Sequence, residues 1–204
     1  MQNAFMSGVT ILLIHNTGGL VLTHLNSRMV AAIAIFAALW GVLNSIFAPI
    51  VFRVFGLPIL CDMIGFAVLT LTVWWIRKFG ATTVVGLIAT VVNFVFNPAG
   101  VHFLGFAAAS MVFDVTAKLI GYDRCFKKPL FVTVSMLSVS VLSAAVAGLI
   151  IGTFFMGTSA LAKWGGVVGW AGLHAAGGVI GGFTGITLVT GLSTRGVRRM
   201  DVKN

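Results

Sequence analysis

Two polar side chains near the C-terminal end of the chain have the types and the spacing to bind a small ring. Trp170 and His174 are four residues apart, so they lie on one face if their segment is a helix. The indole offers a flat stacking surface, and a neutral imidazole offers one hydrogen-bond donor and one acceptor. The pair predicts contact with a small polar ligand, with packing between helices as the alternative.

Further polar residues are expected at the outer ends of three other apolar segments and at the start of the segment that holds Trp170 and His174. Asn44, Asn93, Asn97 and His102 belong to this group, as does Trp164. An amide supplies a donor and an acceptor together, which suits a polar heterocycle. The alternatives are hydrogen bonds between helices for the amides, and a place in an interfacial aromatic belt for Trp164.

Charged residues within apolar segments are functional candidates, because a charge is costly at membrane depth. Asp62 and Lys163 enter their segments from the same side, so they could pair with each other or hold a charged ligand. Asp114 and Lys118 are four residues apart, which predicts a structural ion pair on one helix face. The alternative function is a stand-alone secondary transporter or channel, in which all four residues would form an ion pathway.

The sequence lacks the motifs of many catalytic and nucleotide-binding sites. It contains no glutamate, no His-Glu-x-x-His and no Gly-x-x-x-x-Gly-Lys-Ser/Thr loop. The histidines are scattered, so neither a metal site nor a cofactor is predicted, and Cys61 and Cys125 are interpreted as unpaired thiols. An intramembrane enzyme using His174 and a serine is the weakest alternative, since nothing singles out one among Ser135, Ser138, Ser140 and Ser143.

These residues are set in a chain with the composition of a membrane protein. Hydrophobic residues make up 59% of it and charged residues 8%, whereas soluble domains average about 25% charged residues. Residues 29–52, 79–113, 129–162 and 164–194 contain no Asp, Glu, Lys or Arg, and one helix needs about 20 apolar residues to span a bilayer. The exterior of the folded chain must therefore face lipid.

Turn signals such as Asn97-Pro98-Ala99-Gly100 divide the longest of these runs. Residues 28–204 are predicted to form an all-α, polytopic integral membrane domain with a basic tail, and residues 1–27 to precede it as an extension. That extension is interfacial, an extra helix or disordered. The domain is a bundle of six transmembrane helices, expected at about 29–52, 57–76, 81–97, 101–120, 130–156 and 161–191.

The basic residues predict the orientation of the bundle. Ten of them fall in the flank before the first span, in two connections and in the tail, while Arg53 falls in a connection on the opposite side. Cytoplasmic flanks are enriched in Lys and Arg, so both ends of the domain are predicted in the cytoplasm, in a plasma membrane. Topology therefore explains the net charge of +9, and nucleic acid is not expected as a partner.

The first predicted span carries small residues at four-residue spacing, Ala34 with Ala38 and Ala37 with Gly41. Small residues allow two helices in lipid to approach closely. The pattern predicts a docking face for a partner helix, with packing inside the bundle as the alternative. A similar repeat in the last span, interpreted as internal packing, comprises Gly177, Gly181 and Gly185.

Five short motifs follow the alanine-rich first helix: Trp75-Ile-Arg-Lys-Phe-Gly-Ala81, Asn97-Pro-Ala-Gly100, Met111-Val-Phe-Asp114, Gly121-Tyr-Asp-Arg124 and Gly191-Leu-Ser-Thr-Arg-Gly-Val197. Together with the six predicted spans, they resemble the substrate-binding S component of energy-coupling factor (ECF) transporters. The resemblance covers residues 28–197. The branch linked to thiamine and its hydroxymethylpyrimidine precursor is most similar, and the chain departs from it at Ser110, where an acidic residue is expected.

The resemblance implies a non-enzymatic subunit that captures a small polar, heterocyclic solute, such as a vitamin or vitamin precursor, from outside the cell. It implies that Ala34 and Ala38 dock against a transmembrane T component, which two cytoplasmic ATPases drive. It also implies a pocket that opens outward. The residues at or below the mouth of that pocket would be Asn97, His102, Trp164 and Trp170.

Overall fold

The structure, a computed structural model, describes residues 27–98, 100–197 and 199 of the chain. The described residues form helices and turns only, and five helices are long and apolar enough to cross a membrane, with α4 apolar but shorter. This confirms the predicted all-α membrane bundle; the predicted extension lies outside the described residues, apart from Ser27. The helices are α2 (Ser27–Phe55), α3 (Ile59–Ile76), α4 (Ala81–Phe96), α5 (Phe103–Ile120), α6 (Tyr122–Cys125), α7 (Pro129–Phe154), α8 (Thr158–Ala162) and α9 (Gly166–Thr194).

Glycine and proline residues mark several of the helix boundaries. Gly80, with φ of 90°, leads into α4, and Gly121, with φ of 96°, separates α5 from α6. Glycine adopts a positive φ without the clash that a Cβ would cause. Pro129 occupies the first turn of α7, where its missing N–H has no intrahelical partner to lose.

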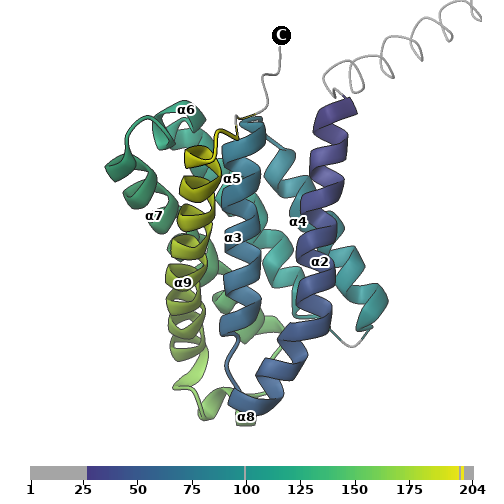
Figure 1. Cartoon of the computed structure of the whole chain (residues 1–204). Helices are drawn as coiled ribbons and strands as arrows, with labels where there is room; N and C mark the ends of the chain where they lie inside the picture. Colours follow the sequence, from purple (N-terminus) through teal and green to yellow (C-terminus); the bar gives the residue numbers. More distant parts are fainter. Residues whose placement is uncertain (1–26, 99, 198, 200–204) are drawn as a thin grey trace, which may run out of the picture.

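The last helix, α9, packs along both α3 and α7, and α2 packs along α4 and α3 (Figure 1). A Cβ on Gly178 would lie 2.6 Å from the Ala144 Cβ of α7, and one on Gly181 would lie 2.6 Å from the Asp62 carbonyl oxygen of α3. Glycine at these positions therefore lets α9 approach both neighbours at backbone distance. The interpretation of this glycine repeat as internal packing is confirmed.

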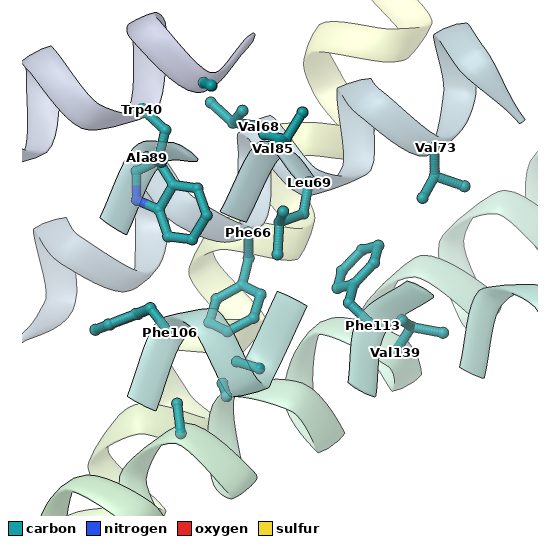
Figure 2. Close-up of a cluster of buried hydrophobic side chains, with 14 of the residues drawn as sticks. Trp40, Phe66, Val68, Leu69, Val73, Val85, Ala89, Phe106, Phe113 and Val139 are labelled. Carbon is teal, nitrogen blue, oxygen red and sulfur yellow. The ribbon is translucent and has the colours of Figure 1, made fainter. Parts of the chain in front are cut away.

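Aromatic side chains fill the interior between α2, α3 and α5 (Figure 2). The Phe66 ring contacts Phe106 and Phe113, each with ring centroids 6.4 Å apart, and Trp40 meets Phe106 edge-on at 6.1 Å. All four side chains are buried. Such ring pairs contribute about 0.5–1.5 kcal/mol each beyond their buried area, so this cluster fixes the position of the three helices.

The two ends of the bundle differ in their elements. One end comprises the end of α2, the start of α3, the α4–α5 connection, α8 and the start of α9 (Figure 1); it is called the pocket end because residues of several of these elements line a cavity. The tail end comprises the start of α2, the end of α3, the helix α6 and the end of α9.

The predicted ion pair between Asp114 and Lys118 is wrong: although both residues belong to the described part of the chain, no salt bridge joins them. The Asp114 carboxylate accepts hydrogen bonds from the Gly80 N–H (2.8 Å), from the N–H and hydroxyl of Thr83 (3.2 and 3.1 Å) and from the Tyr122 hydroxyl (2.7 Å). Lys118 Nζ instead lies 4.0 Å from the centroid of the Phe79 ring. The N–H groups at the start of α4 lack intrahelical acceptors, so the buried carboxylate caps that helix.

The small residues of α2 fall on two different faces. Ala37 and Gly41 are buried, and a Cβ on Gly41 would lie 2.6 Å from Val92 Cγ1 of α4. Their predicted role in partner docking is therefore wrong, because they already pack against the bundle. Ala34 and Ala38 are exposed, so only this half of the predicted docking face is free to contact another helix.

Candidate functional site

A cavity of about 290 Å³ lies at the pocket end of the bundle. Its wall combines the last turns of α2, the α2–α3 connection, the α4–α5 connection and the facing parts of α5, α7 and α9. Phe52 and Arg53 belong to the wall and are exposed, so they mark the mouth. The turns predicted from glycine and proline thus bring residues far apart in the chain around one space.

Four of the residues predicted to bind a substrate line this cavity. Asn97 and His102 flank the α4–α5 connection, and Trp170 and His174 lie on successive turns of α9. Trp170 and His174 lie on one face of α9, as their spacing predicts, with ring centroids 5.3 Å apart and ring planes at 78°. Aromatic rings of Phe103 and others complete the wall.

His174 is held in place by a carboxylate behind it. Its Nδ1 lies 2.9 Å from Asp62 Oδ1 of α3, and the side chains are 2% and 0% exposed. The Phe106 ring packs edge-on against the imidazole at 5.7 Å between centroids. A carboxylate oxygen of ionised Asp62 can only accept, so Nδ1 is the donor in this contact.

Three buried polar atoms around this pair have no hydrogen-bond partner among the described residues: His174 Nε2, Trp170 Nε1 and Asp62 Oδ2. A buried donor or acceptor without a partner costs about 1–3 kcal/mol. His174 and Trp170 line the cavity, so a molecule inside it could satisfy them. Asp62 does not line the cavity and acts through His174.

Asn44 and Asn93 form a bond between helices instead of lining the cavity. Asn44 Nδ2 donates to Asn93 Oδ1 at 2.9 Å, and Asn93 Nδ2 donates to the Ala89 carbonyl at 2.8 Å. Both side chains are buried between α2 and α4. The structure therefore favours the interhelical alternative for these two amides.

Lys163 and Trp164 lie beside the site without forming its wall. Lys163 is exposed after α8, and the carboxylate of Asp62 pairs with His174 rather than with this lysine. The Trp164 ring centroid is 6.1 Å from that of Trp170, so Trp164 packs near the cavity-lining indole.

Asp114 is buried at the opposite end of the bundle, capping α4. The four charged residues of the alternative ion pathway therefore do not line one common space.

Several cavity residues were not singled out from the sequence. Cys61, Phe106 and Met156 line the wall, but an isolated thiol, a phenylalanine or a methionine within an apolar segment carries no signal that distinguishes a cavity from the core. Arg53 also lines the cavity; its signal in the sequence was its position in a connection on the side opposite to the ten other basic residues of the flanks and the tail.

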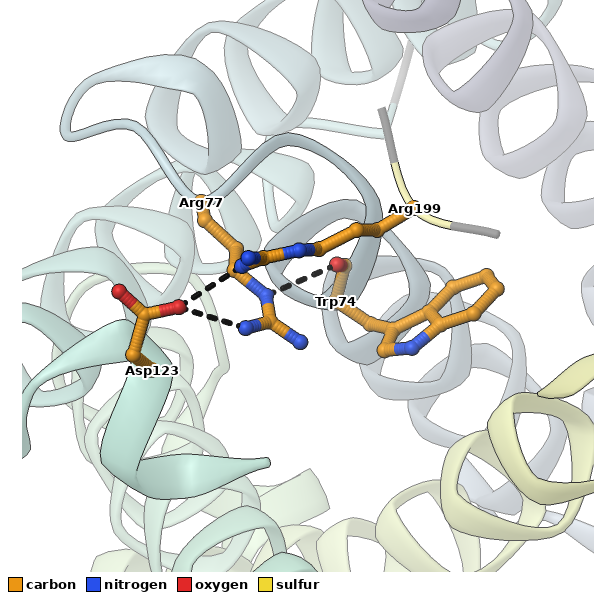
Figure 3. A network of polar contacts seen from close by, with 4 residues as sticks. All are labelled: Trp74, Arg77, Asp123 and Arg199. Atoms are coloured by element: carbon orange, nitrogen blue, oxygen red, sulfur yellow. Dashed lines mark hydrogen bonds and ion pairs between the residues drawn. The ribbon is translucent and has the colours of Figure 1, made fainter. Parts of the chain in front are cut away.

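A second polar network lies at the tail end (Figure 3). Arg77 Nη1 and Arg199 Nη1 both donate to Asp123 Oδ1, at 2.7 and 2.8 Å. The hydrogen bonds from Arg77 and then Arg199 lower the pKa of Asp123 below its usual value. This network joins the α3–α4 connection, α6 and the segment after α9, and it borders no part of the cavity.

The grouping of metal-ligating side chains and the contacts of His174 with serines are two further features of the described part of the bundle. Within residues 27–98, 100–197 and 199, no three His, Cys, Asp or Glu side chains are grouped to hold an ion. Ser135 donates to the Cys125 carbonyl at the tail end, and in the same ranges no serine hydrogen-bonds to His174.

No family model matches the chain, and no curated protein or solved structure proved similar to it. The fold and the site together define a class: a multi-pass helical membrane bundle with a small, mixed polar and aromatic cavity at one end. A more particular function has to be argued from the residues of this chain alone.

Proposed function

We propose that the chain is the S component of an ECF-type importer, a subunit that captures a small polar heterocyclic solute from outside and releases it inward. The cavity at the pocket end carries this proposal. It is a recess in a helical bundle whose described residues contain no cluster suited to a metal. In this proposal the solute is held by its fit to the cavity and by hydrogen bonds to the wall.

The size of the cavity supports a small solute. Its volume of about 290 Å³ lies at the lower end of the roughly 300–1,000 Å³ that is usual for ligand pockets. The aromatic wall favours a flat ring, and Asn97 and His102 offer hydrogen bonds at its edge. A molecule of one or two rings, such as a vitamin or a vitamin precursor, fits these properties.

The exposed alanines of α2 support docking to a transmembrane T component that two cytoplasmic ATPases drive. Ala34 and Ala38 are small exposed residues on a helix that also exposes large side chains such as Ile35 and Val42. In lipid, close backbone approach is a main source of helix association. In this proposal the pocket end faces outward and the basic tail lies in the cytoplasm of a plasma-membrane protein.

Two measurements test the proposal. Native mass spectrometry of the purified protein is expected to detect one retained small molecule, and affinity purification from the source cell is expected to bring down a long-helix membrane subunit and ATPases. Detection of neither a retained small molecule nor the co-purified subunits would refute the assignment as an S component.

The docking step is tested separately with Ala34→Leu combined with Ala38→Leu. The larger side chains are expected to abolish uptake while leaving the retained molecule bound, because α2 docking and the cavity are on different surfaces. Ala176→Leu, at an exposed alanine of α9, is the control. Unchanged uptake in the α2 double variant would contradict docking through this face.

A further inference from the structure

The deepest polar groups of the cavity present a defined pattern of donor and acceptor. Trp170 Nε1 and His174 Nε2 are both buried, both without a partner among the described residues, and both on cavity-lining side chains of α9. The two residues as a whole are 4% and 1% exposed. Since they sit one helical turn apart, a single small ring can reach both.

The hydrogen bond to Asp62 decides what His174 offers to a ligand. With Nδ1 donating to Asp62 Oδ1 at 2.9 Å, the one proton of a neutral imidazole is on Nδ1, and Nε2 presents a lone pair. The indole N–H of Trp170 can only donate. The floor of the cavity, formed by these two lining residues, therefore offers one acceptor and one donor.

We propose, building on the S-component function, that this floor selects flat aromatic heterocycles that place an N–H donor on His174 and a ring acceptor on Trp170. Asp62 is the positioning residue that sets this selection, because it holds the proton of His174 on Nδ1. Rings that lack either group leave a buried polar atom unpaired and bind less tightly.

The charges around the cavity agree with a ring, rather than an acidic group, at this floor. The carboxylate of Asp62 lies directly behind His174, so an anionic group would be repelled there. Among the described residues that line the cavity, the one Lys or Arg side chain is Arg53, at the exposed mouth. An acidic substituent would therefore point toward the mouth.

Three single-ring probes separate the two hydrogen bonds. At pH 8, 2-aminopyridine carries a donor beside a ring acceptor, pyridine carries the acceptor alone, and aniline carries the donor alone. Titration calorimetry on the purified protein in nanodiscs is expected to show 2-aminopyridine binding about 3- to 10-fold more tightly than either of the others, the range expected for one hydrogen bond.

Two nearly isosteric variants should each remove one preference. Trp170→Phe keeps a ring but loses the donor, so 2-aminopyridine loses its advantage over aniline. In Asp62→Asn the amide can either donate to Nδ1 or accept from it, so His174 is no longer held in one tautomer. The ratio of the affinities for 2-aminopyridine and pyridine then falls toward one. Trp75→Phe and Asp123→Asn make the same chemical changes away from the cavity and are expected to keep both ratios.

A spectroscopic readout separates positioning from simple structural damage. In protein with ¹⁵N-labelled histidine, the His174 signals, assigned by their loss in His174→Gln, are expected to show a protonated Nδ1 and a bare Nε2. In Asp62→Asn this pattern changes.

The outcomes are distinct. Equal binding of the three probes by the unaltered protein, absence of any probe binding, or a uniform loss for all probes in both variants would overturn the selection. The S-component function would then still be decided by the retained molecule and the co-purified subunits.

Discussion

Asp114 joins three helices through a single carboxylate. It accepts hydrogen bonds from Gly80 and Thr83 at the start of α4 and from Tyr122 of α6. The free N–H groups of a helix start carry partial positive charge, so a buried anion is stabilised there without a lysine. Lys118 contributes only its position over the Phe79 ring.

This arrangement predicts unequal effects for the two members of the expected ion pair. Asp114→Asn should lower the free energy of unfolding by about 1–3 kcal/mol, since hydrogen bonds to an ionised group are weakened. Lys118→Met should cost about 1 kcal/mol or less, because it loses only an exposed cation–π contact. Thermal unfolding in detergent measures both, and similar losses would indicate that the two charges do pair.

At the same scale, the few polar residues within apolar segments were sufficient to predict part of the cavity wall. Trp170, His174, Asn97 and His102 stood out by type and spacing, and they line the cavity. The partner of His174 could not be predicted, because Asp62 lies 112 positions away in the chain and only the packing of α9 on α3 brings them together. The sequence offered Lys163 as a possible partner of Asp62, whereas the structure pairs this carboxylate with His174.

At the scale of elements, the glycines of α9 divide into packed and free positions. Gly181 faces the backbone of α3, where its added Cβ would lie 2.6 Å from the Asp62 carbonyl oxygen, whereas a Cβ on Gly172 would meet nothing within 4 Å. The first contact involves backbone, which cannot move aside as the end of a side chain can. Gly181 therefore sets the distance between α9 and α3.

The matched pair Gly181→Ala and Gly172→Ala tests this division on one helix. Gly181→Ala should destabilise the protein by about 1–3 kcal/mol through overpacking. Gly172→Ala should be neutral, or stabilising by up to about 1 kcal/mol, since alanine favours a helix. Unfolding in a denaturing detergent compares them, and equal stabilities would contradict close packing at Gly181.

The elements themselves were largely predictable, because runs without charge and turn residues define spans. The short helices α6 and α8 were missed, since a single turn leaves no periodic pattern. The sequence also could not predict which side of α2 packs against the bundle. A helix that is apolar all round has no polar side to orient it, so the sequence does not distinguish Ala37 and Gly41 from Ala34 and Ala38. The packing of Val92 of α4 against Gly41 makes this distinction.

At the scale of the whole molecule, charge separates the two ends. The tail end carries Arg77, Lys78, Arg124 and the lysines before α7, while Arg53 and Lys163 are the basic residues at the pocket end. Lys and Arg accumulate on the cytoplasmic side of membrane proteins. This asymmetry agrees with the proposed outward-facing cavity, and in that proposal the Asp123 network lies on the cytoplasmic side.

That network predicts a pH-dependent attachment of the segment around Arg199. Because hydrogen bonds from Arg77 and Arg199 lower the pKa of Asp123, its contribution is fully present above the unfolded pKa of about 3.9. It is lost as the pH falls through the lower folded value. Asp123 is 81% exposed, so solvent screens the interaction and the effect on global stability is small.

A local measurement is therefore the appropriate one. A spin label at Val197, which packs near Trp74, is expected to be immobile at pH 7 and to gain mobility in Asp123→Asn. The difference between the variant and the unaltered carboxylate should persist down to about pH 3.9 and vanish at lower pH, as Asp123 is protonated through its lowered pKa. High salt at pH 7 should weaken the attachment in the same way, whereas a label that stays immobile in Asp123→Asn would show that Arg199 does not tether this segment.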